Sequence, residues 1–257
     1  MPDDVAKAVS NLLGYLGFAV EFLQEGATKK ADLFAVKDGE HFVIEVKTKE
    51  DDARRGEQME RAFDRGSLYE EVHPMGRRNR ISGIVHQGVR QLTAHAESDP
   101  IRLLWLVVLG PRATVYESQI RATLFGSTRV YDLQETSWQR DCFFFYHSDF
   151  FRWHEDLDGA VIARARSGQL CVNPFSPRAD RLRRSPLAVT FGAGVFDPIL
   201  LEATGDACVV DSDIDRSDEG AVLRFVQRKY GRPMLMNIDM GHHEVWAGFK
   251  LDDELDR

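Results

Sequence analysis

Apolar residues follow two different periods at the start of the chain, one typical of helices and one typical of strands. Asp3 or Asp4 can cap a first helix, after which apolar residues recur at helical spacing. This predicts a helix that ends near Gly17, with one apolar face made of Val5, Val9, Leu12, Leu13 and Leu16. The following apolar residues stand two positions apart and predict a short strand, at Phe18, Val20 and Phe22.

A β-hairpin is predicted next, because Asp38-Gly39 suits a two-residue turn with positive φ at both central positions. The predicted strands are residues 32–36 and 41–47. A turn at this place brings Asp32 opposite Glu45, which gives Cβ atoms roughly 4.5–5.5 Å apart. Lys47 lies on the same face as Glu45, since side chains alternate along a strand.

The charged stretch at residues 48–80 is only weakly periodic and predicts an excursion from the core, with a short helix at residues 56–63. Apolar residues at helical spacing then predict a helix over residues 81–96. A nearly continuous apolar run at residues 101–109 is typical of a strand that is buried on both faces. The predicted order is therefore helix, three strands, helix, strand.

Beyond Gly110 the pattern is weaker. It predicts helices at residues 119–124 and 219–230, and strands at residues 128–132, 142–146, 189–195, 207–210 and 245–251. Prolines in an arginine-rich stretch predict a seam, so we expect a first domain over residues 1–175, with its core at 3–110, and a C-terminal α+β extension over residues 176–257. The fold class is α/β, with a mixed central sheet flanked by helices.

Composition limits the possible functions. The chain has 257 residues and a net charge of −8, which argues against indiscriminate nucleic-acid binding, although local patches decide affinity. Residues 72–96 contain no acid, yet they carry four arginines. Three widely spaced cysteines form no CxxC pair and favour a reducing cytoplasm. We expect no membrane association, because the longest apolar run is too short to span a bilayer and no basic, apolar leader is present.

The pair Asp32 and Glu45 is the main candidate for chemistry. Like charges in directly opposed positions destabilise a sheet, so a fold that keeps them needs a compensating charge. A divalent cation held by oxygen ligands would supply it. The alternative is an ordinary charged surface strand in which Lys47 pairs with Glu45 and Asp32 is incidental.

Ala31-Asp32 and Glu45-Val46-Lys47, within this order of elements, resemble the PD-(D/E)XK or restriction-endonuclease-like nuclease superfamily. The resemblance implies an αβββαβ core in which Asp32 and Glu45 bind Mg²⁺, or Mn²⁺ in its place. It also implies that Lys47 positions the attacking water and that Gln91 assists, with Gln87 as the alternative glutamine. The chain departs from the family in having Ala31 in place of proline and no clear acid on the first helix.

The expected function is metal-dependent hydrolysis of phosphodiester bonds in nucleic acid, with DNA favoured over RNA. Nucleic-acid contacts are expected from residues near the predicted metal, namely Lys49, Arg77, Arg78, Arg80 and Gln87. One alternative is a catalytically weak module of the same fold that binds nucleic acid or an assembly partner. Another is a nuclease used in microbial conflict and silenced by an inhibitory partner. The resemblance also makes a homodimer plausible.

Overall fold

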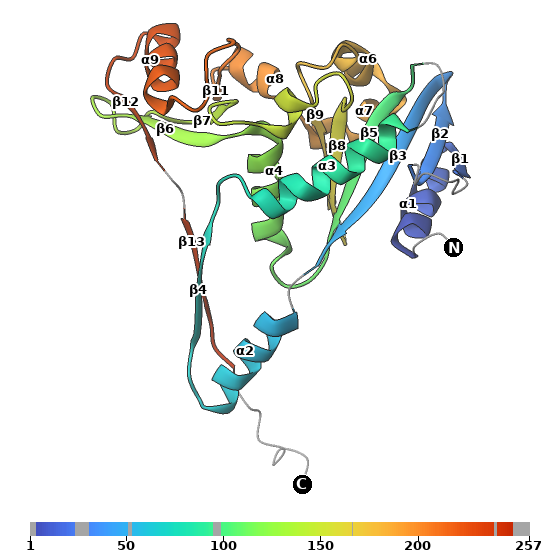
Figure 1. Ribbon diagram of the computed structural model, residues 1–257, viewed down its shortest axis with the longest axis horizontal. Helices are drawn as coiled ribbons and strands as arrows, with labels where there is room; N and C mark the ends of the chain where they lie inside the picture. Colours follow the sequence, from blue (N-terminus) through green and yellow to red (C-terminus); the bar gives the residue numbers. More distant parts are fainter. Residues whose placement is uncertain are drawn as a thin grey trace.

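The computed structural model describes residues 4–23, 31–50, 53–94, 99–165, 167–238 and 241–248. The predicted order of the first elements is confirmed, and Figure 1 shows them on one side of the molecule. These elements are α1 (Asp4–Tyr15), β1 (Ala19–Phe22), β2 (Leu33–Lys37), β3 (Glu40–Lys49), α3 (Asn79–Thr93) and β5 (Ile101–Val108). Within the described ranges, none of the helices has the length and apolar character that a bilayer crossing requires.

The hairpin of β2 and β3 forms in the predicted register. Asp38 and Gly39 both have positive φ, at 50° and 77°, as a two-residue turn of this kind requires. The ladder pairs Lys37 with Glu40 and ends at Leu33 opposite Ile44. Asp32 precedes the first residue of β2, so its place beside β3 is set directly by this turn.

A mixed seven-stranded sheet forms the centre of the molecule, in the order β1-β2-β3-β5-β8-β9-β10. The strands beyond β5 are β8 (Gly159–Arg164), β9 (Ser167–Val172) and β10 (Val195–Phe196). Strands β3, β5 and β8 are parallel to one another, whereas β1, β2 and β3 pair in antiparallel fashion. The expected class, an α/β fold with a mixed central sheet flanked by helices, is confirmed.

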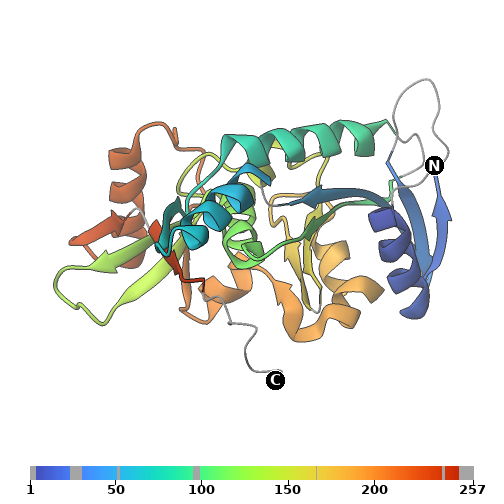
Figure 2. The same ribbon diagram turned by 90° about the horizontal axis from the view of Figure 1, so that it is seen from below.

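Helices cover both faces of this sheet, as Figure 2 shows. Helices α3 and α4 (Ala113–Phe125) pack on one face, where the buried strand residues include Val43, Leu104 and Leu106. Helices α1, α6 (Ala179–Arg184) and α7 (Pro186–Phe191) pack on the other face, against Leu33, Ile44 and Trp105 among others. We call these the α3 face and the α1 face.

A second, four-stranded sheet has the order β11-β7-β6-β12. Its strands are β6 (Thr128–Asp132), β7 (Gln139–Phe143), β11 (Ala207–Val209) and β12 (Leu235–Ile238), and α8 (Pro198–Ala203) and α9 (Glu219–Tyr230) accompany it. The sheets do not divide the chain at residue 176. Strands β6 and β7 precede that position, whereas α6, α7 and β10 follow it and belong to the central sheet and its α1 face.

The excursion predicted at residues 48–80 is an arm that projects from the body in Figure 1. It consists of α2 (Ala53–Asp64), β4 (Tyr69–Pro74) and β13 (Gly241–Trp246), and within the described ranges β4 pairs with β13 alone. The arm is joined to α4 by Glu71, whose carboxylate lies 2.7 Å from the Arg112 guanidinium. Arg55 of α2 also contacts Glu71, at 3.0 Å.

Several predicted elements differ from the structure. Residues 189–194 do not form a strand, because Ser185 caps and Pro186 begins α7, which continues to Phe191; the strand β10 begins only at Val195. Strand β7 ends at Phe143 rather than continuing to residue 146, since Phe144 has positive φ. Strand β13 begins earlier than predicted, at Gly241. Residues 249–251 of that prediction lie outside the described residues.

Candidate active site

The structure brings Asp32, Glu45 and Lys47 to one face of the central sheet. Leu33 and Ile44 point to the α1 face, so their neighbours Asp32 and Glu45 point to the α3 face. Lys47 has the same orientation as Glu45, and Gln91 joins them from the overlying helix α3. The two acids, the lysine and the glutamine therefore converge between β2, β3 and α3, as the sequence predicts.

Asp32 is fixed by both neighbouring strands. Its carbonyl oxygen accepts a hydrogen bond from the Leu23 N–H at 3.0 Å, and its own N–H donates to the Ile44 carbonyl at 3.2 Å. Its carboxylate oxygen Oδ2 accepts from the Val46 N–H at 2.8 Å. This backbone contact orients the carboxylate toward β3, next to Glu45.

Lys47 lies between two oxygen acceptors. Its Nζ is 2.5 Å from Glu45 Oε1 and 2.5 Å from Gln91 Oε1. The Glu45 side chain is only 1% exposed and that of Lys47 is 13% exposed, so the pair is shielded from solvent. A charge-assisted pair with so little water around it is stronger and better oriented than a surface ion pair.

Gly88 of α3 is a part of the site that sequence reasoning missed. A Cβ atom at this position would lie 3.6 Å from Cγ of Glu45 and 2.3 Å from Cδ2 of Leu104. Only glycine lets the helix approach the sheet closely enough for Gln91 to reach Lys47. The signal was present in the sequence, since a glycine inside an amphipathic helix often marks a close approach.

The oxygen donors suit a small, hard cation. Mg²⁺ in proteins is commonly held by one or two carboxylates together with water and substrate phosphate. The site contains two carboxylates, Asp32 and Glu45, and one amine, Lys47. It therefore has an excess of negative charge, which a bound cation would neutralise. Among the residues that the structure describes, no group of three or more His, Cys, Asp or Glu side chains is placed to hold a metal. The two carboxylates are therefore the protein ligands that this site offers.

The first helix contributes no acid to this site for a structural reason. Ala6, Val9 and Leu13 of α1 are buried against the α1 face, so this helix lies on the opposite side of the sheet from Asp32 and Glu45. The missing acid therefore reflects the placement of the helix as well as its sequence.

The arginines expected near the metal lie at the far end of α3, so the expected closeness is wrong, while their contact with nucleic acid stays a prediction. A helix rises 1.5 Å per residue, which separates Arg80 from Gln91 by about 16 Å along the axis. Arg78 and Arg80 are exposed there. Arg77 turns inward, donating to Ser82 Oγ at 3.0 Å and lying 3.5 Å from a carboxylate oxygen of the fully buried Asp149.

The remaining two residues lie nearer to the site. Lys49 follows Lys47 on β3, and its ammonium lies 4.1 Å from the centre of the Tyr116 ring while donating to the Glu50 carbonyl. Gln87 is exposed on α3, one turn before Gln91. Gln87 and Arg80 are both exposed on α3, whereas Lys49 lies against Tyr116 of α4.

Comparisons with protein-family models, with curated proteins and with solved structures found no match to this chain.

Proposed function

We propose that this protein is a metal-dependent nuclease with a restriction-endonuclease-like core, and that it hydrolyses phosphodiester bonds in DNA in preference to RNA. One observation carries the proposal: Asp32, Glu45, Lys47 and Gln91 converge on the same face of the sheet. Two carboxylates beside a shielded amine supply what phosphodiester hydrolysis requires, namely a cation site and a positive charge close to it.

Each residue has a defined part in this mechanism. Asp32 and Glu45 would hold Mg²⁺, which when bound acidifies a water and offsets charge on the transferred phosphate. Lys47 supplies positive charge where negative charge develops on the phosphate oxygens. Gln91 and Glu45 hold the Lys47 amine in place, so that little reorganisation is needed during the reaction.

The exposed face of α3 supports nucleic acid as the substrate. It carries Arg80, Gln87 and Arg90, with Arg78 just before the helix, and residues 72–96 contain no acid. Arginines neutralise phosphates and make binding dependent on salt. A polyanion lying along this helix would reach from Arg78 to the carboxylate site.

The proposal is tested by cleavage assays on DNA and RNA with Mg²⁺ or Mn²⁺. We expect Glu45→Ala and Lys47→Ala each to lower the rate by a factor of about 10² or more, because each removes charge from the reacting centre. Matched controls are Glu155→Ala, at a side chain that is 74% exposed, and Lys7→Ala on the α1 face, at one that is 48% exposed. Both controls should retain wild-type rates.

Equal rates for the wild type and Glu45→Ala would exclude this site as the source of cleavage. No cleavage by either protein, on any of these substrates, would reject the proposal that this protein is a nuclease.

A second candidate function is a nucleic-acid-binding module with a weak or inactive site. The placement of α1 on the opposite face favours it, because the described residues then offer two carboxylates and no third. Isothermal titration with Mg²⁺ separates the two candidates. The nuclease should bind the ion and lose that binding in Glu45→Ala, whereas the module should bind DNA without binding the ion.

A further inference from the structure

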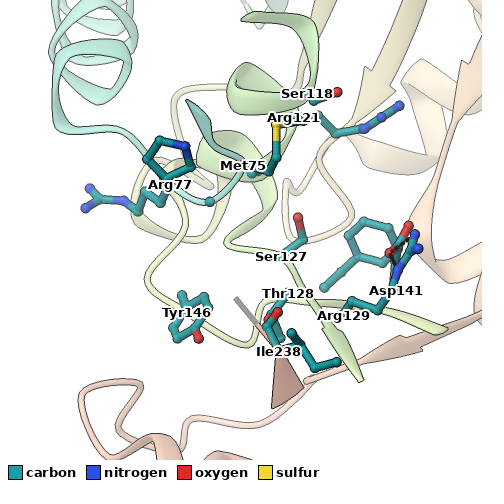
Figure 3. Close-up of a pocket in the computed structure, with 14 residues that line it drawn as sticks. Met75, Arg77, Ser118, Arg121, Ser127, Thr128, Arg129, Asp141, Tyr146 and Ile238 are labelled. Carbon is teal, nitrogen blue, oxygen red and sulfur yellow. Dashed lines mark hydrogen bonds and ion pairs between the residues drawn. The ribbon is translucent and has the colours of Figure 1, made fainter. Parts of the chain in front are cut away.

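A cavity of about 500 Å³ lies beyond the end of α3 that is distant from Gln91. It opens between α4, the second sheet and the segment that joins β4 to α3, and Figure 3 shows the side chains around it. We call it the α4–β6 cavity and define it by Ser118, Arg121, Ser127, Thr128, Arg129 and Tyr146. Its volume is in the range of sites for small ligands, which is about 300–1,000 Å³.

Positive charge surrounds this cavity although the chain as a whole is acidic. Arg77, Arg121 and Arg129 line it, against Asp141 as the single acid. Arg129 pairs with Asp141 at 2.9 Å. In Figure 3 the side chains of Arg77 and Arg121 turn away from the middle of the cavity. Arg77 lies 3.5 Å from the Asp149 carboxylate, whereas Arg121 donates to the neutral Gln169 side chain at 3.3 Å, so Arg121 places net positive charge at the edge of the cavity. An anionic group would therefore be held at the rim.

Neutral groups face the middle of the cavity. Figure 3 shows the Ser127 hydroxyl there, with Met75 above it near Ser118 and Tyr146 on the opposite wall. Within the described chain, the hydroxyls of Ser118 and Ser127 make no hydrogen bond, so both can bind a ligand. Thioether, aromatic and hydroxyl groups together suit a flat ring with polar edges.

The wall that carries Tyr146 is held in place by the backbone. The Tyr146 N–H donates to the Gly126 carbonyl at 2.9 Å. A Cβ at Gly126 would lie 2.3 Å from the Tyr146 carbonyl oxygen, and Gly126 has a φ of +58°. This turn therefore requires glycine, and it fixes Tyr146 relative to Ser127 before any ligand arrives.

We propose that the α4–β6 cavity binds one nucleotide of the substrate strand after its base has left the stack. The inference rests on the proposed function, since the same polynucleotide would run along α3 to the carboxylates. The base would enter among Ser127, Met75 and Tyr146, with its flanking phosphates at the arginine rim. The span of about 16 Å along α3 from Arg80 to Gln91 equals about five rises of 3.4 Å, so the bound nucleotide lies about five or more positions from the cleaved bond.

The test uses duplex DNA with 2-aminopurine placed at successive positions, the full chain and no divalent metal. The fluorescence of 2-aminopurine increases when the base leaves the stack. We expect a several-fold increase at one position when the wild-type complex forms. Deoxynucleoside 5′-monophosphates at millimolar concentration should compete for the cavity and reduce that increase.

Two substitutions fill the cavity, Ser127→Phe and Ser118→Phe. Each should abolish the increase while the protein still binds the duplex. The matched control is Ser137→Phe, at an exposed serine between β6 and β7 that does not line the cavity, and it should retain the increase. The competition by monophosphates is measured on the wild type, so it tests the inference even if a filled variant does not fold.

The outcomes separate this inference from the proposed function. A complex without any fluorescence increase, or an increase that both filled variants retain, overturns the cavity proposal even where the wild type cleaves DNA. An increase without cleavage in Mg²⁺ leaves the cavity proposal standing and rejects the nuclease. Failure of the wild type to bind any duplex overturns the cavity proposal, and the cleavage assay on DNA and RNA then decides the nuclease.

Discussion

Asp149 is a carboxylate without solvent exposure, close to the start of α3. Burial raises its pKa above the ordinary value, and the hydrogen bond from Ser82 and the charge of Arg77 offset only part of that effect. Ser82 Oγ donates to its Oδ1 at 2.8 Å. The ionised form is therefore disfavoured in the folded protein relative to the unfolded chain.

This gives a pH dependence with a definite sign. An unfolded aspartate titrates near pH 3.9, so the unfolded chain releases this proton first and stability falls as the pH rises from about 4 through the folded pKa. Asp149→Asn cannot ionise. We expect its free energy of unfolding, relative to the wild type, to rise across this pH window, measured by urea unfolding at each pH.

The control for this series is Asp38→Asn, which removes an exposed carboxylate in the hairpin turn. It reports how the loss of one negative charge by itself changes the free energy of unfolding. A difference between Asp149→Asn and the wild type that stays constant or declines with pH would contradict the argument.

Helix α3 contains two glycines whose replacement by alanine should change the stability of the protein in opposite directions. Gly83 is exposed, and a Cβ there would have no atom within 4 Å, so Gly83→Ala should stabilise the protein by up to about 1 kcal/mol. At Gly88 the added methyl would meet the fully buried Leu104. Gly88→Ala should therefore destabilise by about 1–3 kcal/mol, as overpacked cores do.

The measurement is the urea midpoint of both variants, together with the cleavage rate. Gly88→Ala should also slow cleavage, because a displaced α3 moves Gln91 away from Lys47. Stabilisation by both substitutions would show that α3 does not press on the sheet at Gly88.

Elements with local signals were predictable from sequence, whereas those that depend on distant partners were not. The hairpin followed from Asp38-Gly39 because turn chemistry and alternation act over a few residues. Strand β10 has two residues and exists only because β9 lies beside it. Gln91 was expected at the site from the resemblance, and it does contact Lys47. The distance to Arg80 depended on the direction of α3, which sequence periodicity does not give.

The arm has a sheet of its own, separate from the central sheet. Among the described residues its strand β4 pairs with β13 alone, and Val245 lies opposite Glu70. Val245→Pro restricts the backbone and removes an N–H, so the arm should loosen while the central sheet stays folded. Trypsin should then cut faster at the arginines of α2, with the main unfolding transition displaced by less than about 0.5 kcal/mol.

Val245→Thr is the matched control, since it keeps the branched shape and the N–H. It should resist trypsin as the wild type does. A large loss of global stability in Val245→Pro would show instead that the arm and the body unfold as one cooperative unit.

The pairing of β4 with β13 also orders events during synthesis. Strand β4 ends at Pro74, whereas its partner begins at Gly241. Ribosomes add about 5–20 residues per second, so β4 waits on the order of ten seconds for that partner to emerge. In that interval the nascent chain presents an open strand edge, which chaperones or a neighbouring copy on the same messenger can capture.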